Sequence, residues 1–214
     1  MRILLFFLLV VFMSCCSEKT IELPEIKQAT ITEVIDVSAA YLFYDETKPD
    51  SIELNRKNLI STTNWLVNVD KRLTLNQAVP KIKFIQEKKR NSSHKNEAAK
   101  NYFTCHDLSQ NNLGFIEFTD VHYYLDEKPN AEIEIIIEAL DKITIKKNND
   151  VDIFFKTNFK TLEKDLASIY PLETISVTLS FKRSMTFQQY ITIKSKLDEL
   201  DYSKILVDTN EFIY

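Results

Sequence analysis

The sequence predicts an α+β fold, in which an antiparallel or mixed sheet carries helices packed on one face. Three observations favour this fold class. Runs of β-branched residues alternate in the second half with two segments that repeat hydrophobic residues at helical spacing. The chain is 44% hydrophobic and contains 14 Phe and 9 Tyr, enough to fill a core. Glycine occurs once, at position 114, so most turns must be made by Asn and Asp.

The first half shows one helical pattern between strand patterns. One or two strands are predicted by ATITEVIDVSAAYLFYDE, which mixes β-branched and aromatic residues. Alternating large residues in NWLVNV predict a strand that runs into a turn at 70–71. A helix over 76–90 is predicted by NQAVPKIKFIQEKKR, with Pro80 accommodated in its first turn. After a polar loop, GFIEFTDVHYYL predicts a single strand over 114–125.

The second half has a clearer pattern. The charged, proline-containing segment DEKPN at 126–130 predicts a boundary between two domains, over 29–127 and 131–214. Beyond it, the predicted order is β-β-α-β-α-β. The strands are EIEIIIEAL, DKITIKK, TISVTLSF and SKILVD, and the helices are FKTLEKDLASIY and MTFQQYITIKSKLDEL. Because VDKRLTL and LDKITI both place Asp-Lys at a turn, the two halves are hypothesised to be similar small sub-domains.

The N-terminus predicts export. Arg2 is the only charged residue before an apolar run over 3–13, which is shorter than the about 20 residues a membrane-spanning helix needs. A basic start, a short apolar middle and small residues are typical of a secretory signal peptide. Ser14 followed by Cys15 resembles the lipobox-type signal of bacterial lipoproteins, with Cys16 as the alternative cysteine.

This resemblance implies how the chain is processed and placed. Residues 1–14 would be removed, and Cys15 would carry palmitate-containing acyl chains that anchor the protein in a membrane. A tether over 15–28 would then connect the anchor to the folded body. The implied location is the bacterial cell envelope, either at the outer membrane or on the periplasmic face of a membrane.

The C-terminal half resembles the periplasmic domain of the ExbD/TolR biopolymer-transport family. The resemblance is carried by LDKITIKKNND, FKTLEKDL and ISVTLSFKRSMTFQQYITIKSKLDELDYSKILVDTNEF. The matching positions are Asp141 at the first turn, 181–185 before the second helix and 204–207 in the last strand. Family members carry a transmembrane helix with a proton-handling Asp, and the cysteine-bearing signal stands in its place here. The resemblance therefore implies a non-enzymatic envelope module that self-associates or binds an envelope protein, without proton coupling.

Composition excludes several function classes. A net charge of −4 argues against a nucleic-acid partner, because such proteins present a basic face. A single glycine rules out the P-loop, the dinucleotide-binding fingerprint and the G-x-S-x-G elbow. The metal-ligand candidates are Cys105, His106 and His122, but their spacing matches no closed zinc motif. We therefore expect no enzyme activity, no cofactor and no metal.

An alternative function is binding of glycan or peptidoglycan at the surface. Aromatic side chains stack on sugar rings when they are exposed. The candidate contacts are Trp65, Tyr123 and Tyr124, each in a predicted strand.

Overall fold

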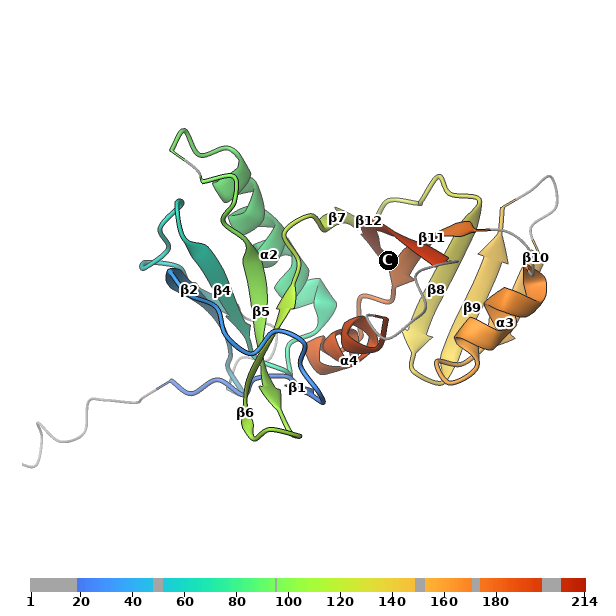
Figure 1. Ribbon diagram of the computed structural model, residues 1–214, viewed down its shortest axis with the longest axis horizontal. Coiled ribbons are helices and arrows are strands. Elements are labelled where there is room, and N and C mark those ends of the chain that lie inside the picture. Colours follow the sequence, from blue (N-terminus) through green and yellow to red (C-terminus); the bar gives the residue numbers. More distant parts are fainter. Residues whose placement is uncertain (1–18, 48–51, 95, 149–152, 171–173, 198–204) are drawn as a thin grey trace, which may run out of the picture.

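A computed structural model describes residues 19–47, 52–94, 96–148, 153–170, 174–197 and 205–214 (Figure 1). The predicted signal peptide and the cysteines at 15 and 16 lie outside these ranges. Within them, the chain forms two six-stranded mixed sheets and three helices, so the predicted α+β class is confirmed.

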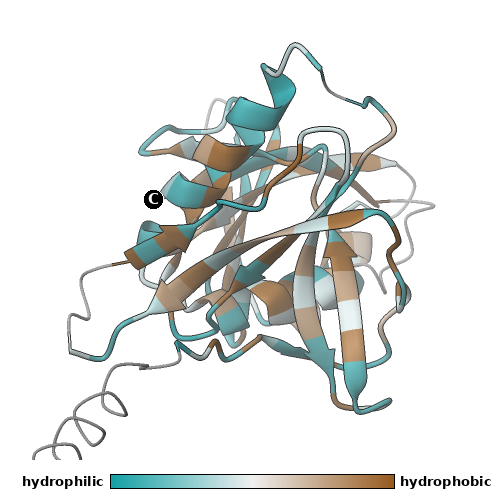
Figure 2. Cartoon of the chain, turned by 90° about the vertical axis from the view of Figure 1, so that its left-hand side faces the viewer, coloured by the Kyte–Doolittle hydropathy of each residue, from teal (hydrophilic) through white to brown (hydrophobic). Residues whose placement is uncertain are grey.

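The first sheet has the order β1-β5-β4-β2-β3, and β6 pairs with β5. Its strands are β1 (Glu25–Ile26), β2 (Val37–Tyr44), β3 (Ile52–Asn55), β4 (Asn64–Val69), β5 (Asn101–Asp107) and β6 (Asn112–Glu117). The β1, β5, β4 and β2 neighbours are parallel, whereas β3 and β6 pair antiparallel. Alternating bands of hydrophobic and hydrophilic residues run along these strands in Figure 2. Helix α2 (Leu75–Arg90) follows β4 and buries its apolar face.

The second sheet has the order β10-β9-β8-β11-β12-β7. Its strands are β7 (His122–Leu125), β8 (Ile133–Ala139), β9 (Lys142–Lys147), β10 (Ile153–Thr157), β11 (Ile175–Phe181) and β12 (Ile205–Ile213). Helix α3 (Leu162–Ile169) follows β10, and α4 (Phe187–Leu197) follows β11. The β8, β11, β12 and β7 neighbours are parallel, and β9 and β10 add two antiparallel pairings.

The two halves repeat one topology. The order β3-β2-β4-β5-β1 in the first sheet corresponds to β9-β8-β11-β12-β7 in the second, with the same direction for every equivalent pair. In the first half β3 is followed by β4, whereas in the second β10 and α3 are inserted between β9 and β11. The equivalent segments are VDKRLTLNQAV at 69–79 and FKRSMTFQQYI at 181–191. The predicted match of VDKRLTL with LDKITI is wrong, because LDKITI forms the β8–β9 hairpin.

These equivalent segments meet at a seam between the halves. Four backbone N–H groups donate across it in two related pairs: Leu75 to the Met185 oxygen (2.8 Å) and Phe187 to the Leu73 oxygen (2.6 Å), then Asn76 to the Arg183 oxygen (2.9 Å) and Gln188 to the Lys71 oxygen (3.1 Å). Thr74 and Thr186 form an antiparallel bridge at the centre. The seam therefore has approximate twofold symmetry within one chain.

Both halves share one hydrophobic core. Helix α4 lies between the two sheets (Figure 1), and the Tyr190 ring is 6.2 Å from Phe103 on β5 and 5.1 Å from Phe181 on β11. Buried hydrophobic residues from both sheets and from all three helices belong to a single cluster. Strand β7 precedes the predicted boundary at 126–130 but pairs with β12. The second sheet thus begins before that boundary.

Three element predictions are wrong in detail. Over 131–214 the observed order is β-β-β-α-β-α-β, because the unpredicted strand β10 precedes α3. The predicted strand over 114–125 is two strands in different sheets, because the chain turns at 119–120 between β6 and β7. Helix α2 begins at Leu75 rather than at 76, so Pro80 lies in its second turn. The earlier start follows from the seam, which supplies acceptors for the first helical N–H groups.

The Thr186 cap at the start of α4, beside the seam, is expected to contribute to the free energy of unfolding. The Thr186 hydroxyl accepts the Gln189 N–H at 3.2 Å, and the Gln189 side chain accepts the Thr186 N–H at 2.9 Å. We expect Thr186→Ala to lower the free energy of unfolding by about 1 kcal/mol in urea denaturation, because a helical N–H loses its partner. The exposed Thr62→Ala is the control, with an expected change within about 0.5 kcal/mol. Equal effects of the two substitutions would contradict the assignment.

Candidate functional site

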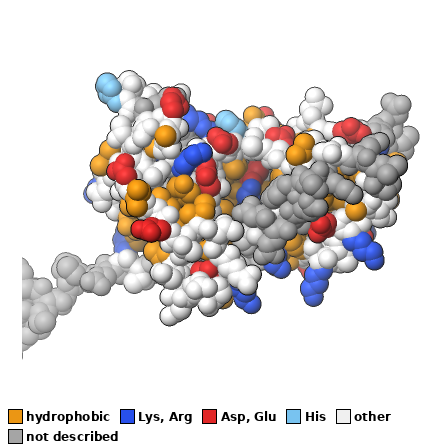
Figure 3. All heavy atoms as spheres, viewed as in Figure 1, with side chains coloured by type: hydrophobic (Ala, Val, Ile, Leu, Met, Phe, Trp, Pro, Cys, Tyr) orange, Lys and Arg blue, Asp and Glu red, His pale blue; other side chains and the backbone are white. Residues whose placement is uncertain are grey.

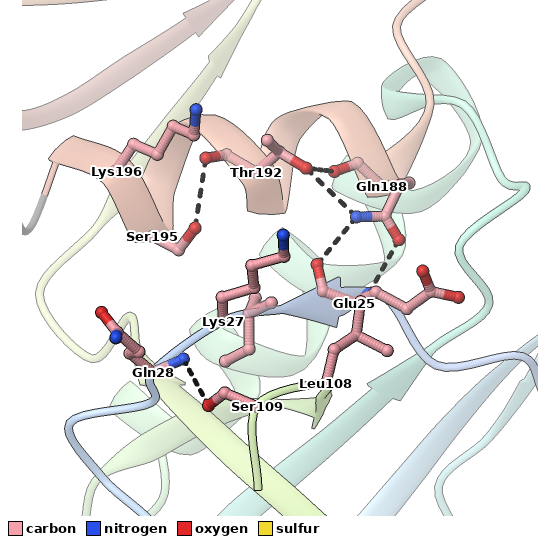
Figure 4. Close-up of a pocket in the computed structure, with 10 residues that line it drawn as sticks. Glu25, Lys27, Gln28, Leu108, Ser109, Gln188, Thr192, Ser195 and Lys196 are labelled. Carbon is pink, nitrogen blue, oxygen red and sulfur yellow. Dashed lines mark hydrogen bonds between the residues drawn. The ribbon is translucent and has the colours of Figure 1, made fainter. Parts of the chain in front are cut away.

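A groove runs beside the seam, between β1 and α4 (Figure 4). Its volume is about 500 Å³, within the size range of sites that hold small ligands. One wall comes from each half of the chain. The lining residues are Glu25, Ile26, Lys27, Gln28, Leu108, Ser109, Gln188, Thr192, Ser195 and Lys196.

The α4 wall is built from polar residues at helical spacing. Gln188, Thr192 and Ser195 are separated by four and three residues, which places them on one face of the helix. The opposite face carries the buried residues Phe187 and Tyr190. Core packing therefore turns the polar face of α4 toward the groove.

The Gln188 side chain fastens the two walls together. Its Oε1 accepts the Glu25 N–H at 2.8 Å, and its Nε2 donates to the Glu25 oxygen at 2.9 Å. One amide side chain thus satisfies both backbone groups of a β1 residue, as a neighbouring strand would. Its Nε2 also donates to the Thr192 hydroxyl at 3.1 Å, which fixes that hydroxyl in the groove wall.

Asp107 holds the opposite wall in shape. Its carboxylate accepts the N–H groups of Gln28 (3.2 Å), Ala29 (2.8 Å) and Ser109 (2.8 Å), and the Ser109 hydroxyl at 2.6 Å. These bonds, led by that from the Ser109 hydroxyl, lower the pKa of Asp107 to about 2. Gln28 has a positive φ of 57°, and the Asp107 contacts hold the chain in this bend.

The groove presents hydrogen-bonding groups and one ammonium group. Figure 4 shows the exposed Lys27 side chain extending toward α4, while Lys196 points away from it. The Glu25 carboxylate is held outside by Lys71, at 2.8 Å. Hydroxyls of Ser195 and Thr192 complete the polar surface. This arrangement suits binding of an oxygen-rich ligand.

A second hollow of about 230 Å³ lies near Trp65 and contains a structural lysine. The Lys89 ammonium donates to the oxygens of Thr63 (3.1 Å) and Lys100 (3.1 Å) and to Asn101 Oδ1 (2.9 Å). Burial lowers the pKa of Lys89 to about 8. All three of its donors are used by the protein, so we assign Lys89 to the fold rather than to chemistry.

The aromatic candidates for sugar stacking are mostly buried. Trp65 and Tyr123 are each 3% exposed, and both belong to the hydrophobic core shared by the two halves. Tyr123 also shares a hydrogen bond of 3.0 Å between its hydroxyl and that of Tyr190. Tyr124 is half-buried and stacks on Phe212 at 5.0 Å. The expectation that these rings are exposed is therefore wrong for Trp65 and Tyr123.

The metal-ligand candidates do not converge. Cys105 is fully buried in β5, and burial raises the pKa of its thiol. The neighbouring His106 points to the opposite face and lies 3.3 Å from Asn111 Oδ1, whereas His122 belongs to the second sheet. Across the part of the chain that the structure describes, no three His, Cys, Asp or Glu residues are grouped to hold a metal ion.

The groove residues were missed by sequence reasoning. The polar stripe on α4 was a usable signal, because its members recur at helical spacing opposite the apolar face. The β1 wall offered no such signal, because Glu25 contacts Gln188, which is 163 residues away in the sequence.

The chain matches no protein-family model, no curated protein and no solved structure. None of the helices in the described ranges is both long and apolar enough to cross a membrane. On the face shown in Figure 3, acidic and basic side chains are interspersed rather than gathered by sign.

The groove wall predicts an acid-dependent stability. Because the pKa of Asp107 is lowered in the folded chain, its contribution is present above pH 4 and is lost as the pH falls toward 2. We expect Asp107→Asn to be less stable than wild type at pH 6, with the difference shrinking steadily below pH 4. Urea denaturation of both proteins between pH 6 and pH 2 measures this. A difference that stays constant over that range would contradict the assignment.

Proposed function

We propose that this chain is a bacterial cell-envelope lipoprotein whose body is a non-enzymatic protein-interaction module. The observation that carries the proposal is the surface of β10. Ile153, Phe154 and Phe155 are 43%, 57% and 40% exposed on a strand at the edge of the second sheet. Soluble proteins usually protect such an edge, since its free backbone groups and apolar side chains invite another chain. Binding of an envelope protein or of a second copy would cover them.

The start of the described chain supports close placement at a membrane. Lys19 pairs with Glu53 on β3, the Glu22 N–H donates to Asp70 at 3.2 Å, and the Lys71 N–H donates to the Glu22 oxygen at 2.8 Å. The tether predicted over 15–28 is therefore docked on the body from Lys19 onward. With acyl chains on Cys15, the four intervening peptide links span at most about 14 Å.

A short span has a consequence for the function we propose. The folded body would lie beside the bilayer surface in a restricted set of orientations, because no long flexible linker separates it from the anchor. Restricting the orientation raises the effective concentration of one surface toward partners in the same membrane. This supports an interaction role over the scavenging of a freely diffusing ligand.

The proposal predicts a labelled adduct in cells. A photo-crosslinking amino acid replaces Phe154, and the cells are fed labelled palmitate. We expect a labelled protein band and a labelled adduct of higher mass, because β10 lies against another protein. The same replacement at Leu113, which is 43% exposed on β6, is the matched control and should be labelled without an adduct. Label that persists after Cys15→Ala plus Cys16→Ala, or a Phe154 variant that gives no adduct, would contradict the proposal.

A second candidate function is glycan or peptidoglycan binding. The observation that favours it is the groove, which places hydroxyls, an amide and the Lys27 ammonium around about 500 Å³. Sugars and muropeptides present hydroxyl, amide and carboxylate groups that match these donors and acceptors.

This candidate predicts retention on cell-wall material. We expect wild-type protein to co-sediment with purified peptidoglycan and Lys27→Ala to be released several-fold more readily, because the groove loses its ammonium group. Lys57→Ala, an exposed lysine outside the groove, is the control. Equal retention of the two variants would exclude the groove as the binding site.

A further inference from the structure

We propose that β10 pairs antiparallel with β10 of a second copy of this chain, so that the second sheets of two molecules join edge to edge. The inference rests on the proposed interaction function and names its partner. It is argued from the other sheet edges, from the internal repeat and from the side chains of β10 itself.

Three other sheet edges in the described chain, at β6, β1 and β3, are covered or charged. At β6, the Phe115 N–H donates to the Ile31 oxygen at 2.9 Å, so the preceding segment occupies that edge. At β1, the Gln188 amide takes both backbone groups of Glu25. At β3, Glu53 brings a charge that pairs with Lys19. Natural sheets use such devices to prevent unwanted pairing.

Strand β10 combines an end position with apolar exposure. It is the last strand of its sheet, at the right-hand end of Figure 1, and contains no proline. Helix α3 buries Leu162 and Leu166 completely, yet Phe155 stays 40% exposed. The side chains of β10 are thus presented for pairing rather than hidden beneath its own helix.

The internal repeat shows that β10 is an addition. The first half forms its sheet with β3, the counterpart of β9, at the equivalent end. The second half extends the same sheet by β10 and α3. An inserted strand that leaves its apolar residues exposed contributes little to the stability of its own half. A partner strand that covers these residues would explain why they are apolar.

The sequence of β10 is complementary to itself in the antiparallel direction. Centring the pair on Phe155 places Phe155 opposite its own copy, Ile153 opposite Thr157 and Phe154 opposite Lys156. Phe154 and Lys156 share one face of the strand, so two ammonium–ring contacts form across the pair. The Phe154 ring already lies 5.9 Å from the Lys146 ammonium in one molecule.

Alternative geometries fit less well. In-register parallel pairing would place Lys156 beside its own copy, and like charges at adjacent positions are unfavourable. Antiparallel pairing about a twofold axis also closes on itself, because each copy has one such edge to offer. The expected product is therefore a dimer and not a fibre.

The experiment uses the full chain in detergent micelles, with Cys16→Ser to remove a reactive thiol. We expect Phe155→Cys to form a disulfide-linked dimer under mild oxidation, because the two positions face each other at the twofold axis. Ile153→Cys should crosslink several-fold less, since it faces Thr157. Leu113→Cys, with similar exposure on β6, should give no dimer.

Sedimentation gives an independent measurement on the same protein. We expect wild type to sediment as a dimer, and Phe154→Lys plus Phe155→Lys to raise the dimer Kd by at least about tenfold, because charges replace apolar contacts. Leu113→Lys should leave the dimer intact. Melting by circular dichroism checks folding, and we expect little change because both rings are exposed.

The outcomes separate this inference from the proposed function. A monomeric wild type, or a dimer that survives both lysine substitutions, overturns the pairing. A Phe155→Cys variant that crosslinks in cells to a different protein overturns self-pairing and leaves the interaction function standing. A Phe154 photo-adduct that is absent from cells overturns both.

Discussion

The reciprocal hydrogen bonds across the seam are the constraint on which the rest of the molecule depends. The first N–H groups of any helix have no partner within the helix. Here the first two of α2 donate to Met185 and Arg183, and the first two of α4 donate to Leu73 and Lys71. Each half thus completes the helix start of the other. Separating the halves would leave these N–H groups to water. It would also expose the aromatic residues that pack around Tyr190.

The groove is a product of the same constraint. Its α4 wall is positioned by the seam, and its β1 wall is positioned by pairing with β5 and by the Gln188 amide. Neither half contains the groove alone. Its polar character follows from amphipathicity, since α4 gives its apolar face to the core shared by both sheets. A small change in seam geometry would alter the distance between Lys27 and Ser195 more than it would alter either sheet.

The sequence predicted the fold class and most of the second half, because its strands and helices keep clean periodicities. Strand β5 was missed because its buried residues include Asn101, Thr104 and Asp107, which break the hydrophobic pattern. Strand β10 was missed because it is exposed on both faces, so burial imposes no alternation on it. Long-range order was beyond local patterns altogether. No periodicity reveals that β7 leaves the first half to pair with β12.

Linking two copies of one topology in a single polypeptide permits asymmetry that a homodimer of identical chains cannot have. In a homodimer each substitution or insertion appears on both sides of the axis. Here the extension by β10 and α3 occurs only in the second half, and β6 occurs only in the first. The tandem arrangement thus lets each half carry structure that the other lacks. The first half contributes the β1 wall of the groove, and the second contributes the α4 wall and the exposed edge at β10.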